Sequence, residues 1–260
     1  MTPSTERLFI DLILILYLAG AAGYFAGRRF TWLEKAAFWL SSAGLAANLL
    51  ALVNRVSLSG RLPLANGYEF LLSFTFITVL LYLLYEIISG NKRAGGVVML
   101  LNGLLTASIV LLMPQHIGYT APLMPALQSP WLTVHVITEI IAYSAFTLAA
   151  GLAIIQLRNA VPGDDLSLYK IVSAGFAMLS LSIVLGAVWA EQVWGRYWTW
   201  DPKETWALVT WIIYAIYLHL HRQRGWRGNN ARLLVIIGFL LMLFTFFGVN
   251  YLLPGLHSYA

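Results

Sequence analysis

The sequence predicts an all-α protein, a bundle of about eight helices that crosses a membrane several times. Composition, the length of the apolar segments and the grouping of charges between them support this prediction. Of the 260 residues, 60% are hydrophobic and only 10% are charged, whereas a soluble domain carries about 25% charged residues. So little charge cannot cover a water-facing surface. We therefore expect an integral membrane protein whose surface contacts the lipid bilayer.

The apolar segments have the length of membrane helices. A hydrocarbon core of about 30 Å needs about 20 apolar residues in a helix. Charged or turn-forming residues separate eight predicted helices, over residues 8–27, 34–53, 67–89, 95–113, 131–157, 168–189, 203–221 and 232–252. There is no clear internal repeat, so we expect a single transmembrane domain over residues 1–260.

Three of these helices begin with a sequence typical of a helix N-terminus. At Thr31, Asn66 and Asp201 a capping residue is followed three positions later by glutamate, as in a capping box. Pro202 would occupy the first helical position, where its missing N–H costs little. We therefore expect Asp201 first of all to cap a helix.

Lysine and arginine gather on one set of alternate loops, which predicts the orientation. Loops on the cytoplasmic side of a membrane carry the excess of these residues. One side holds eleven of the sixteen: Arg28, Arg29, Lys35, Lys92, Arg93, Arg158, Lys170, Arg222, Arg224, Arg227 and Arg232. We expect that side to be cytoplasmic and both termini to lie outside. The same grouping accounts for the net charge of +5 without a nucleic acid partner.

Residues 189–211 form the most unusual segment, and its part at about 189–206 is a predicted external loop rich in tryptophan. Six of the ten tryptophans lie at Trp189, Trp194, Trp198, Trp200, Trp206 and Trp211. They could belong to an interfacial aromatic belt. A compact cluster of indoles could instead offer a flat apolar surface to a large planar ligand. Arg196 and Lys203 flank it and could meet carboxylates of that ligand, or be ordinary juxtamembrane charges.

Two of the five histidines fall on the same predicted outer side as this loop. His135 starts the fifth helix and His257 follows the last. Imidazole is a common axial ligand of heme iron, so the pair could form a bis-histidine site, with Glu139 holding the other ring nitrogen of His135. A hydrogen-bonded packing role for each remains open. His219 lies near the inner end of the seventh helix, too far away to join them, and His221 is expected to be solvated.

Residues 194–211 resemble the tryptophan-rich WWD signature of heme-handling cytochrome c assembly proteins; their sequence is WGRYWTWDPKETWALVTW. The part from Asp201 to Trp206 is similar to the CcsA branch, called ResC in some bacteria. Four further stretches resemble elements of that branch: residues 66–69, 127–135, 218–219 together with 224–228, and 255–259. No cysteine is present, so any thiols in the chemistry belong to a substrate.

The resemblance implies a heme-binding subunit of the system II holocytochrome c synthase, in a bacterial inner membrane or a thylakoid membrane. It implies heme b as bound substrate, CcsB (ResB) as membrane partner and apocytochrome c as the acceptor of heme. His135 and His257 would be the outer axial ligands and His219 an inner heme ligand. Trp194, Trp198, Trp200, Asp201 and Arg196 would line the external site. Enzyme activity is expected only of the complex, as a cytochrome c heme lyase.

Two alternatives remain open from the sequence. One is a heme exporter or chaperone similar to CcmC, which shares the loop and the outer histidines but attaches no heme. The other is an unrelated polytopic transporter with an aromatic belt. His219 and the residues that follow Asp201 favour the CcsA branch.

Overall fold

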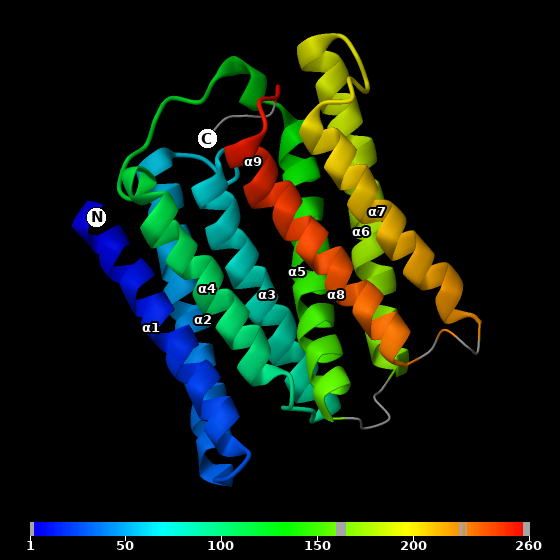
Figure 1. Cartoon of the computed structure of the whole chain (residues 1–260). Helices are drawn as coiled ribbons and strands as arrows, with labels where there is room; N and C mark the ends of the chain where they lie inside the picture. The colour runs from blue at the N-terminus through cyan, green and yellow to red at the C-terminus, as the bar shows by residue number, and fades with distance from the viewer. Residues whose placement is uncertain (1–2, 160–164, 224–225, 227, 257–260) are drawn as a thin grey trace. The chain divides into compact units, whose positions relative to one another are not determined.

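In the computed structural model the described residues form mainly α-helices (Figure 1), which confirms the predicted all-α membrane bundle. The structure describes residues 3–159, 165–223, 226 and 228–256. These residues form two compact units, residues 1–123 and 124–260. Each unit is a set of neighbouring helices with its own buried residues, and each is described by itself below.

Unit 1, residues 1–123, contains four long helices: α1 (Pro3–Gly27), α2 (Thr31–Ser59), α3 (Gly67–Ser89) and α4 (Gly95–Leu112). The helix α1 packs on α2 and α4, and α3 packs on α2 and α4. Gly60 and Gly90 end α2 and α3 with φ of 68° and 67°, a left-handed conformation that glycine adopts without steric cost. A short 3-10 turn, Pro114–His116, follows α4.

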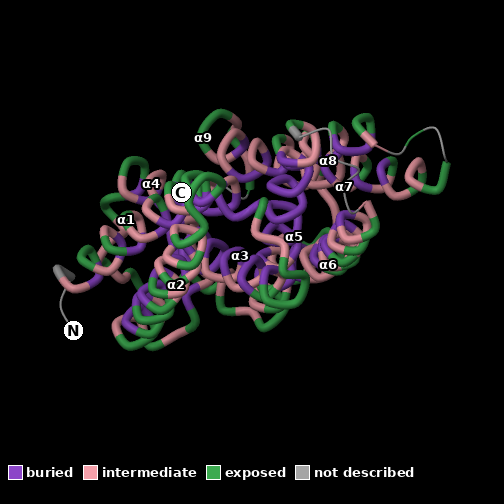
Figure 2. Tube along the Cα trace, turned by 90° about the horizontal axis from the view of Figure 1, so that it is seen from below, coloured by how far each residue is buried: buried purple, intermediate pink, exposed green. Residues whose placement is uncertain are grey.

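Unit 2, residues 124–260, is built on α5 (Pro130–Asn159), α6 (Asp165–Trp194), α7 (Pro202–His221) and α8 (Asn229–Leu243). A π-helical stretch, Phe244–Gly248, continues α8 into the short α9 (Val249–Leu252). A 3-10 turn, Pro125–Leu127, precedes α5. The helix α5 packs on α6 and α8, and α7 on α6 and α8, and Figure 2 shows α5 as mainly buried.

Seven helices of the described residues are long and apolar enough to cross a membrane. All eight predicted segments are helical, but α7 is not among the seven. Its first turn contains Lys203 and Glu204, and its last turn contains His219 and His221, which lower its apolar content. The predicted orientation of the termini stays a prediction.

The N-termini of the helices agree with two of the three predicted caps. Asn66 accepts a hydrogen bond from the backbone of Glu69, and Asp201 with Glu204 forms a complete capping box. The prediction for Thr31 was wrong, because Phe30 occupies the cap position of α2 and makes no side-chain cap hydrogen bond. Thr31 is itself the first helical residue.

Candidate functional site

The tryptophan-rich loop is shorter than predicted. The helix α6 continues to Trp194, so the irregular segment covers residues 195–201 between α6 and α7. Gly195 ends α6 with φ of 72°, which a side chain would disfavour. Trp200 also has a positive φ, 59°, a conformation that costs a residue with a Cβ about 1–3 kcal/mol and recurs at functional sites.

Glu204 in the first turn of α7 holds this loop in place. Its carboxylate accepts hydrogen bonds from the backbone of Thr199, at 2.8 Å, and of Asp201, at 3.2 Å. The hydroxyl of Thr199 donates to the same carboxylate. Three donors on one side chain fix the residues on both sides of Trp200, which stabilises its strained backbone.

The indole rings pair edge to face and do not form one flat surface. The rings of Trp189 and Trp194 lie 4.9 Å apart at 68°, and those of Trp198 and Trp200 lie 5.7 Å apart at 86°. This is a preferred geometry for aromatic pairs. The ring of Trp200 is exposed, and the buried indole N–H of Trp198 has no acceptor among the described residues. A ligand that meets these rings would find one exposed face and one unpaired donor.

His135 lies in the second turn of α5 with its ring against α6. Its Nδ1 is 2.8 Å from the carbonyl oxygen of Ser182. A carbonyl only accepts, so this contact needs a hydrogen on Nδ1; the hydroxyl oxygen of Ser182 lies 3.0 Å from the same nitrogen. Gly186 leaves room for the ring, since a Cβ there would lie 2.9 Å from two ring atoms.

Glu139 lies beside the other nitrogen of His135. Its carboxylate oxygen is 3.6 Å from Nε2. Glu139 thus lies beside one ring nitrogen of His135, and the Ser182 carbonyl lies at the other. The role of Glu139 beside a bound metal stays a prediction. A metal ion at Nε2 would replace the contact with Glu139.

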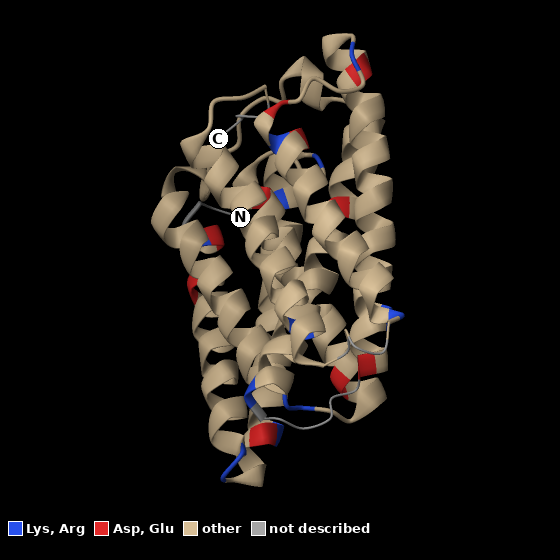
Figure 3. Ribbon diagram, turned by 45° about the vertical axis from the view of Figure 1, so that its right-hand side comes forward, with Lys and Arg blue, Asp and Glu red and all other residues tan. Residues whose placement is uncertain are grey.

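The first turn of α7 brings Lys203 into the same region. Lys203 interacts electrostatically with Glu139 and Asp201, and its ammonium lies 3.4 Å from the side-chain oxygen of Asn250 on α9. Thus α5, α7 and α9 place charged or polar groups together at one end of unit 2. Figure 3 shows that charged residues lie mainly near helix ends in this chain.

Asp201 joins the loop to the segment that follows α9. Its Oδ1 accepts from the backbone of Lys203 at 3.0 Å, and its Oδ2 accepts from the backbone of Leu256 at 2.6 Å. Gly255 permits this approach, because a Cβ there would lie 2.5 Å from Oδ2. Asp201 is 6% exposed, and each of its two carboxylate oxygens accepts one of these backbone hydrogen bonds. His257, the next predicted ligand along the chain, lies outside the described residues.

The remaining predicted residues are separated from this end of unit 2 or face outward. Arg196 is exposed and makes no ion pair within the described part of the chain. His219 is also exposed; it lies 16 residues beyond Lys203 on the same helix, so about 24 Å away. His221, expected to be solvated, instead stacks on Tyr169 of α6 with ring centroids 4.7 Å apart.

Unit 1 contains a buried ion cluster that was not predicted from the sequence. The guanidinium of Arg55 lies 2.9 Å from Glu69 and 3.7 Å from Glu6, and these three side chains are at most 1% exposed. Arg61 pairs with Glu69 at 2.7 Å, and Tyr68 donates to Glu6. The available signal was Arg55 two residues after the predicted apolar helix 34–53, because α2 continues to Ser59 and a membrane-embedded charge is expected to be paired,.

The cluster also fixes the loop after α4. Arg55 donates to the carbonyl of Tyr119 at 2.8 Å, and Glu6 accepts from the backbone of Gly118 at 2.6 Å. The residues 66–69, noted above as a family element, therefore join the start of α1, the end of α2, the start of α3 and this loop. Their observed contacts are structural and lie within unit 1.

The fold and the clustered polar groups define a multi-pass helical membrane protein with a candidate ligand site at one end of unit 2. Comparison with a family model described as "Cytochrome C assembly protein" gives a match over residues 64–257. The chain belongs to this family, and its role therefore lies in cytochrome c biogenesis.

Individual relatives agree with this membership. The chain is 38% identical to the cytochrome c biogenesis protein CcsA of Chlamydomonas reinhardtii, over 82% of its own length and 65% of the relative's. It is 35% identical to CcsA of Synechococcus sp. (strain CC9605), over 86% of its own length and 90% of the relative's. The solved structure of the cytochrome c heme lyase CcmF is similar with a TM-score of 0.78 and 18% identity. It covers 95% of this chain and 47% of CcmF, and shows a shared fold.

Proposed function

We propose that this chain is the heme-binding membrane subunit of a system II holocytochrome c synthase. In this proposal it presents heme b, its substrate, at the outer membrane face and positions it for attachment to the CXXCH motif of apocytochrome c. The observation that supports it best is the hydrogen bond between Asp201 and Leu256. It brings the residue before His257 to the tryptophan-rich loop, in the unit where His135 also lies.

The residues present suit heme as a ligand. The Ser182 carbonyl lies 2.8 Å from Nδ1 of His135, so Nε2 is the nitrogen through which this ring would bind a metal, and a carbonyl at the other nitrogen is usual around a ligating histidine. The exposed Trp200 ring offers apolar surface. The unpaired N–H of Trp198 and the charge of Arg196 suit the carboxylates of heme,. His257 would supply the second axial nitrogen.

In this reaction the protein would position heme for attack by the thiols and would not itself react. Heme supplies the vinyl groups and the apocytochrome supplies the thiols, so each thioether forms by adding S–H across a vinyl double bond, with sulfur on one carbon and hydrogen on the other. That addition needs no cysteine in this chain. Holding the vinyl carbons where the thiols arrive removes much of the entropic barrier. His135, the loop and Asp201 would do that holding.

The proposal includes an inner heme station and a partner. His219 is exposed on α7, so it is available to a site completed by another chain. We propose that CcsB supplies the matching histidine there, and that heme passes from this station to the outer one. We further propose that the two units form one functional transmembrane domain with the tryptophan-rich loop on the periplasmic or lumenal side.

Imidazole rescue tests the ligand roles. His135→Ala and His257→Ala, each produced with the partner chain, are expected to abolish cytochrome c maturation in cells, and added imidazole is expected to restore it by filling the vacated position. His116→Ala is the matched control and is expected to mature cytochrome c normally. Wild-type maturation by either ligand variant without imidazole would remove that histidine from the site.

Single-cysteine labelling tests the sidedness. The chain contains no cysteine, so Tyr197→Cys in the loop and Arg93→Cys between α3 and α4 each introduce one exposed thiol. A membrane-impermeant maleimide added to intact cells is expected to label the first variant and not the second. The opposite labelling pattern would invert the proposed orientation.

A further inference from the structure

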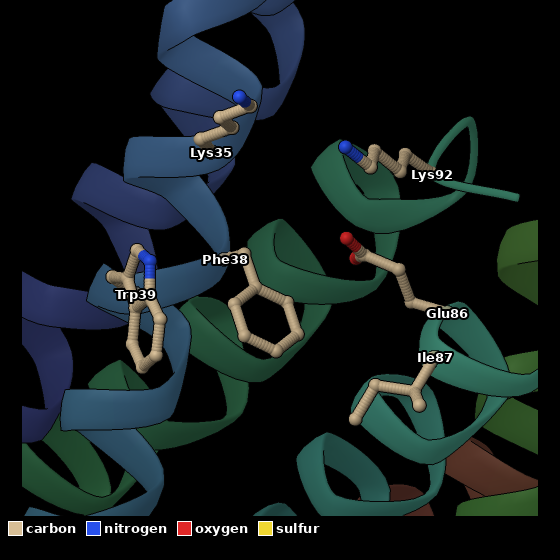
Figure 4. A pocket seen from close by; sticks show the side chains of 6 residues that line it. All are labelled: Lys35, Phe38, Trp39, Glu86, Ile87 and Lys92. Carbon is tan, nitrogen blue, oxygen red and sulfur yellow. The ribbon is translucent and has the colours of Figure 1, made fainter. Parts of the chain in front are cut away.

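A cavity in unit 1 is lined by none of the residues proposed above to bind heme. It has a volume of about 280 Å³ and is lined by Lys35, Phe38 and Trp39 of α2, Glu86 and Ile87 of α3, and Lys92 of the following turn. Figure 4 shows the side chains of both lysines at one rim, with Phe38 and Ile87 opposite them. A liquid water molecule occupies about 30 Å³, so the space suits a small polar headgroup.

Glu86 gives the cavity an unusual inner wall. The residue is 5% exposed, and its Oε2 accepts hydrogen bonds from Tyr24 at 2.6 Å and Tyr82 at 2.7 Å. Its other oxygen, Oε1, has no hydrogen-bond partner among the residues that the structure describes. Oε1 is not one of the buried unpaired atoms of the described residues, so it is accessible from the cavity. A ligand with a hydrogen-bond donor would satisfy it.

The two lysines place positive charge at the rim of the cavity, opposite in sign to the carboxylate of Glu86. Lys35 is exposed and has no ion pair within the described residues, while Lys92 lies 3.9 Å from Glu34. A contact of that length between partly exposed groups holds Lys92 weakly. Both ammonium groups are therefore available to an anion at the rim.

The surface beside the cavity is apolar. Trp39 is 71% exposed, and Ile87 and Ile88 are 65% and 84% exposed. Both α2 and α3 are candidate membrane spans, and a tryptophan near the end of such a helix is typical of the headgroup level. A ligand with acyl chains would cover this surface, whereas a soluble phosphate compound would not.

From these contacts we propose that the cavity binds a phospholipid headgroup that combines a phosphate with an N–H or O–H donor. The phosphate lies between Lys35 and Lys92, the donor meets Oε1 of Glu86, and the acyl chains follow Trp39 and Ile87. Phosphatidylethanolamine and phosphatidylglycerol both have this chemistry. Phosphatidylcholine has the phosphate but its quaternary ammonium has no N–H.

Native mass spectrometry of the purified full chain tests the proposal, with the three lipids added on identical acyl chains. Phosphatidylethanolamine and phosphatidylglycerol are expected to bind more tightly than phosphatidylcholine. Lys35→Gln with Lys92→Gln is expected to weaken the binding of both about fivefold. Arg93→Gln, an exposed neighbour outside the cavity, is the matched control and is expected to bind as wild type. Equal binding of all three lipids, or unchanged binding by the double variant, would overturn the proposal.

Two further arms identify the donor contact and the source of the ligand. Glu86→Gln is expected to reduce the preference for phosphatidylethanolamine over phosphatidylcholine, and an undiminished preference would contradict the contact with Oε1. Glycerophosphoethanolamine, the soluble headgroup, is expected not to displace the lipid at equal concentration. Displacement by it would show a site for soluble phosphates and overturn the lipid assignment.

Discussion

The carboxylate of Asp201 accepts the backbone N–H of Leu256 at 2.6 Å while it caps α7. One buried side chain thus ties the tryptophan-rich loop to the residue that precedes His257. The aspartate of this loop was a predicted heme contact, and the hydrogen bonds described above join it to the backbone of Lys203 and Leu256. Its contribution to heme binding would then be indirect, through the position of the C-terminal segment.

Replacing Asp201 tests this indirect role. Asp201→Ala removes a charge-assisted hydrogen bond worth about 2 kcal/mol, so we expect about thirtyfold weaker retention of heme, measured by absorption of the purified complex. Imidazole is expected to restore retention, because it replaces a misplaced His257. Asp11→Asn, an exposed acid paired with Arg7, is the control. Failure of imidazole to restore retention would assign Asp201 a direct role instead.

Gly186 offers a second test of the His135 position. A Cβ at this residue would lie 2.9 Å from the ring of His135, so the ring must turn away from Ser182. We expect Gly186→Ala to lower heme retention and to shift the heme absorption maxima, while Val184→Ala, exposed on the same helix, leaves both unchanged. An unaltered spectrum in Gly186→Ala would mean that the observed ring position does not matter for ligation.

The ion cluster in unit 1 is expected to act on stability. Glu69→Ala leaves Arg55 buried without its nearest partner, which costs about 3–5 kcal/mol. Thermal unfolding in detergent should therefore show a clearly lower midpoint for Glu69→Ala. Arg7→Ala breaks only an exposed pair and should change the midpoint little. Equal midpoints for the two variants would contradict a structural role for the cluster.

The two histidines at the end of α7 are expected to differ. His219 is exposed, so His219→Ala should lower heme loading of the outer site without changing the thermal midpoint. His221 stacks on Tyr169, so His221→Ala should lower the midpoint by loss of packing. Heme loading quantified on purified complexes, beside the midpoint, separates the two effects. Normal loading in His219→Ala would rule out its inner station.

The sequence predicted what depends on local chemistry. The caps at Asn66 and Asp201 were predictable because the capping residue and its glutamate are three positions apart. Thr31 has the same spacing but lies one residue inside α2, and spacing alone does not locate the first turn. The number of apolar segments between them predicted that the start of α5 and the tryptophan-rich loop lie on the same side of the membrane.

What the sequence could not supply depends on how helices pack. Ser182 lies 47 positions from His135 in the sequence. Its carbonyl reaches the ring because α6 is turned about its axis so that Ser182 faces α5. The pair of Arg55 and Glu69 needs the turn between α2 and α3 to bring the two together. The edge-to-face tryptophans likewise reflect side-chain rotations, so a cluster of indoles in sequence did not determine their relative angles.

The absorption spectrum of this chain, purified with its partner from cells supplied with heme, tests the central claim most directly. A bis-histidine site at His135 and His257 predicts low-spin heme in the wild type, and high-spin heme in His135→Ala that returns to low-spin with imidazole. A colourless wild-type preparation, or a His135→Ala spectrum identical to that of the wild type, would contradict the account.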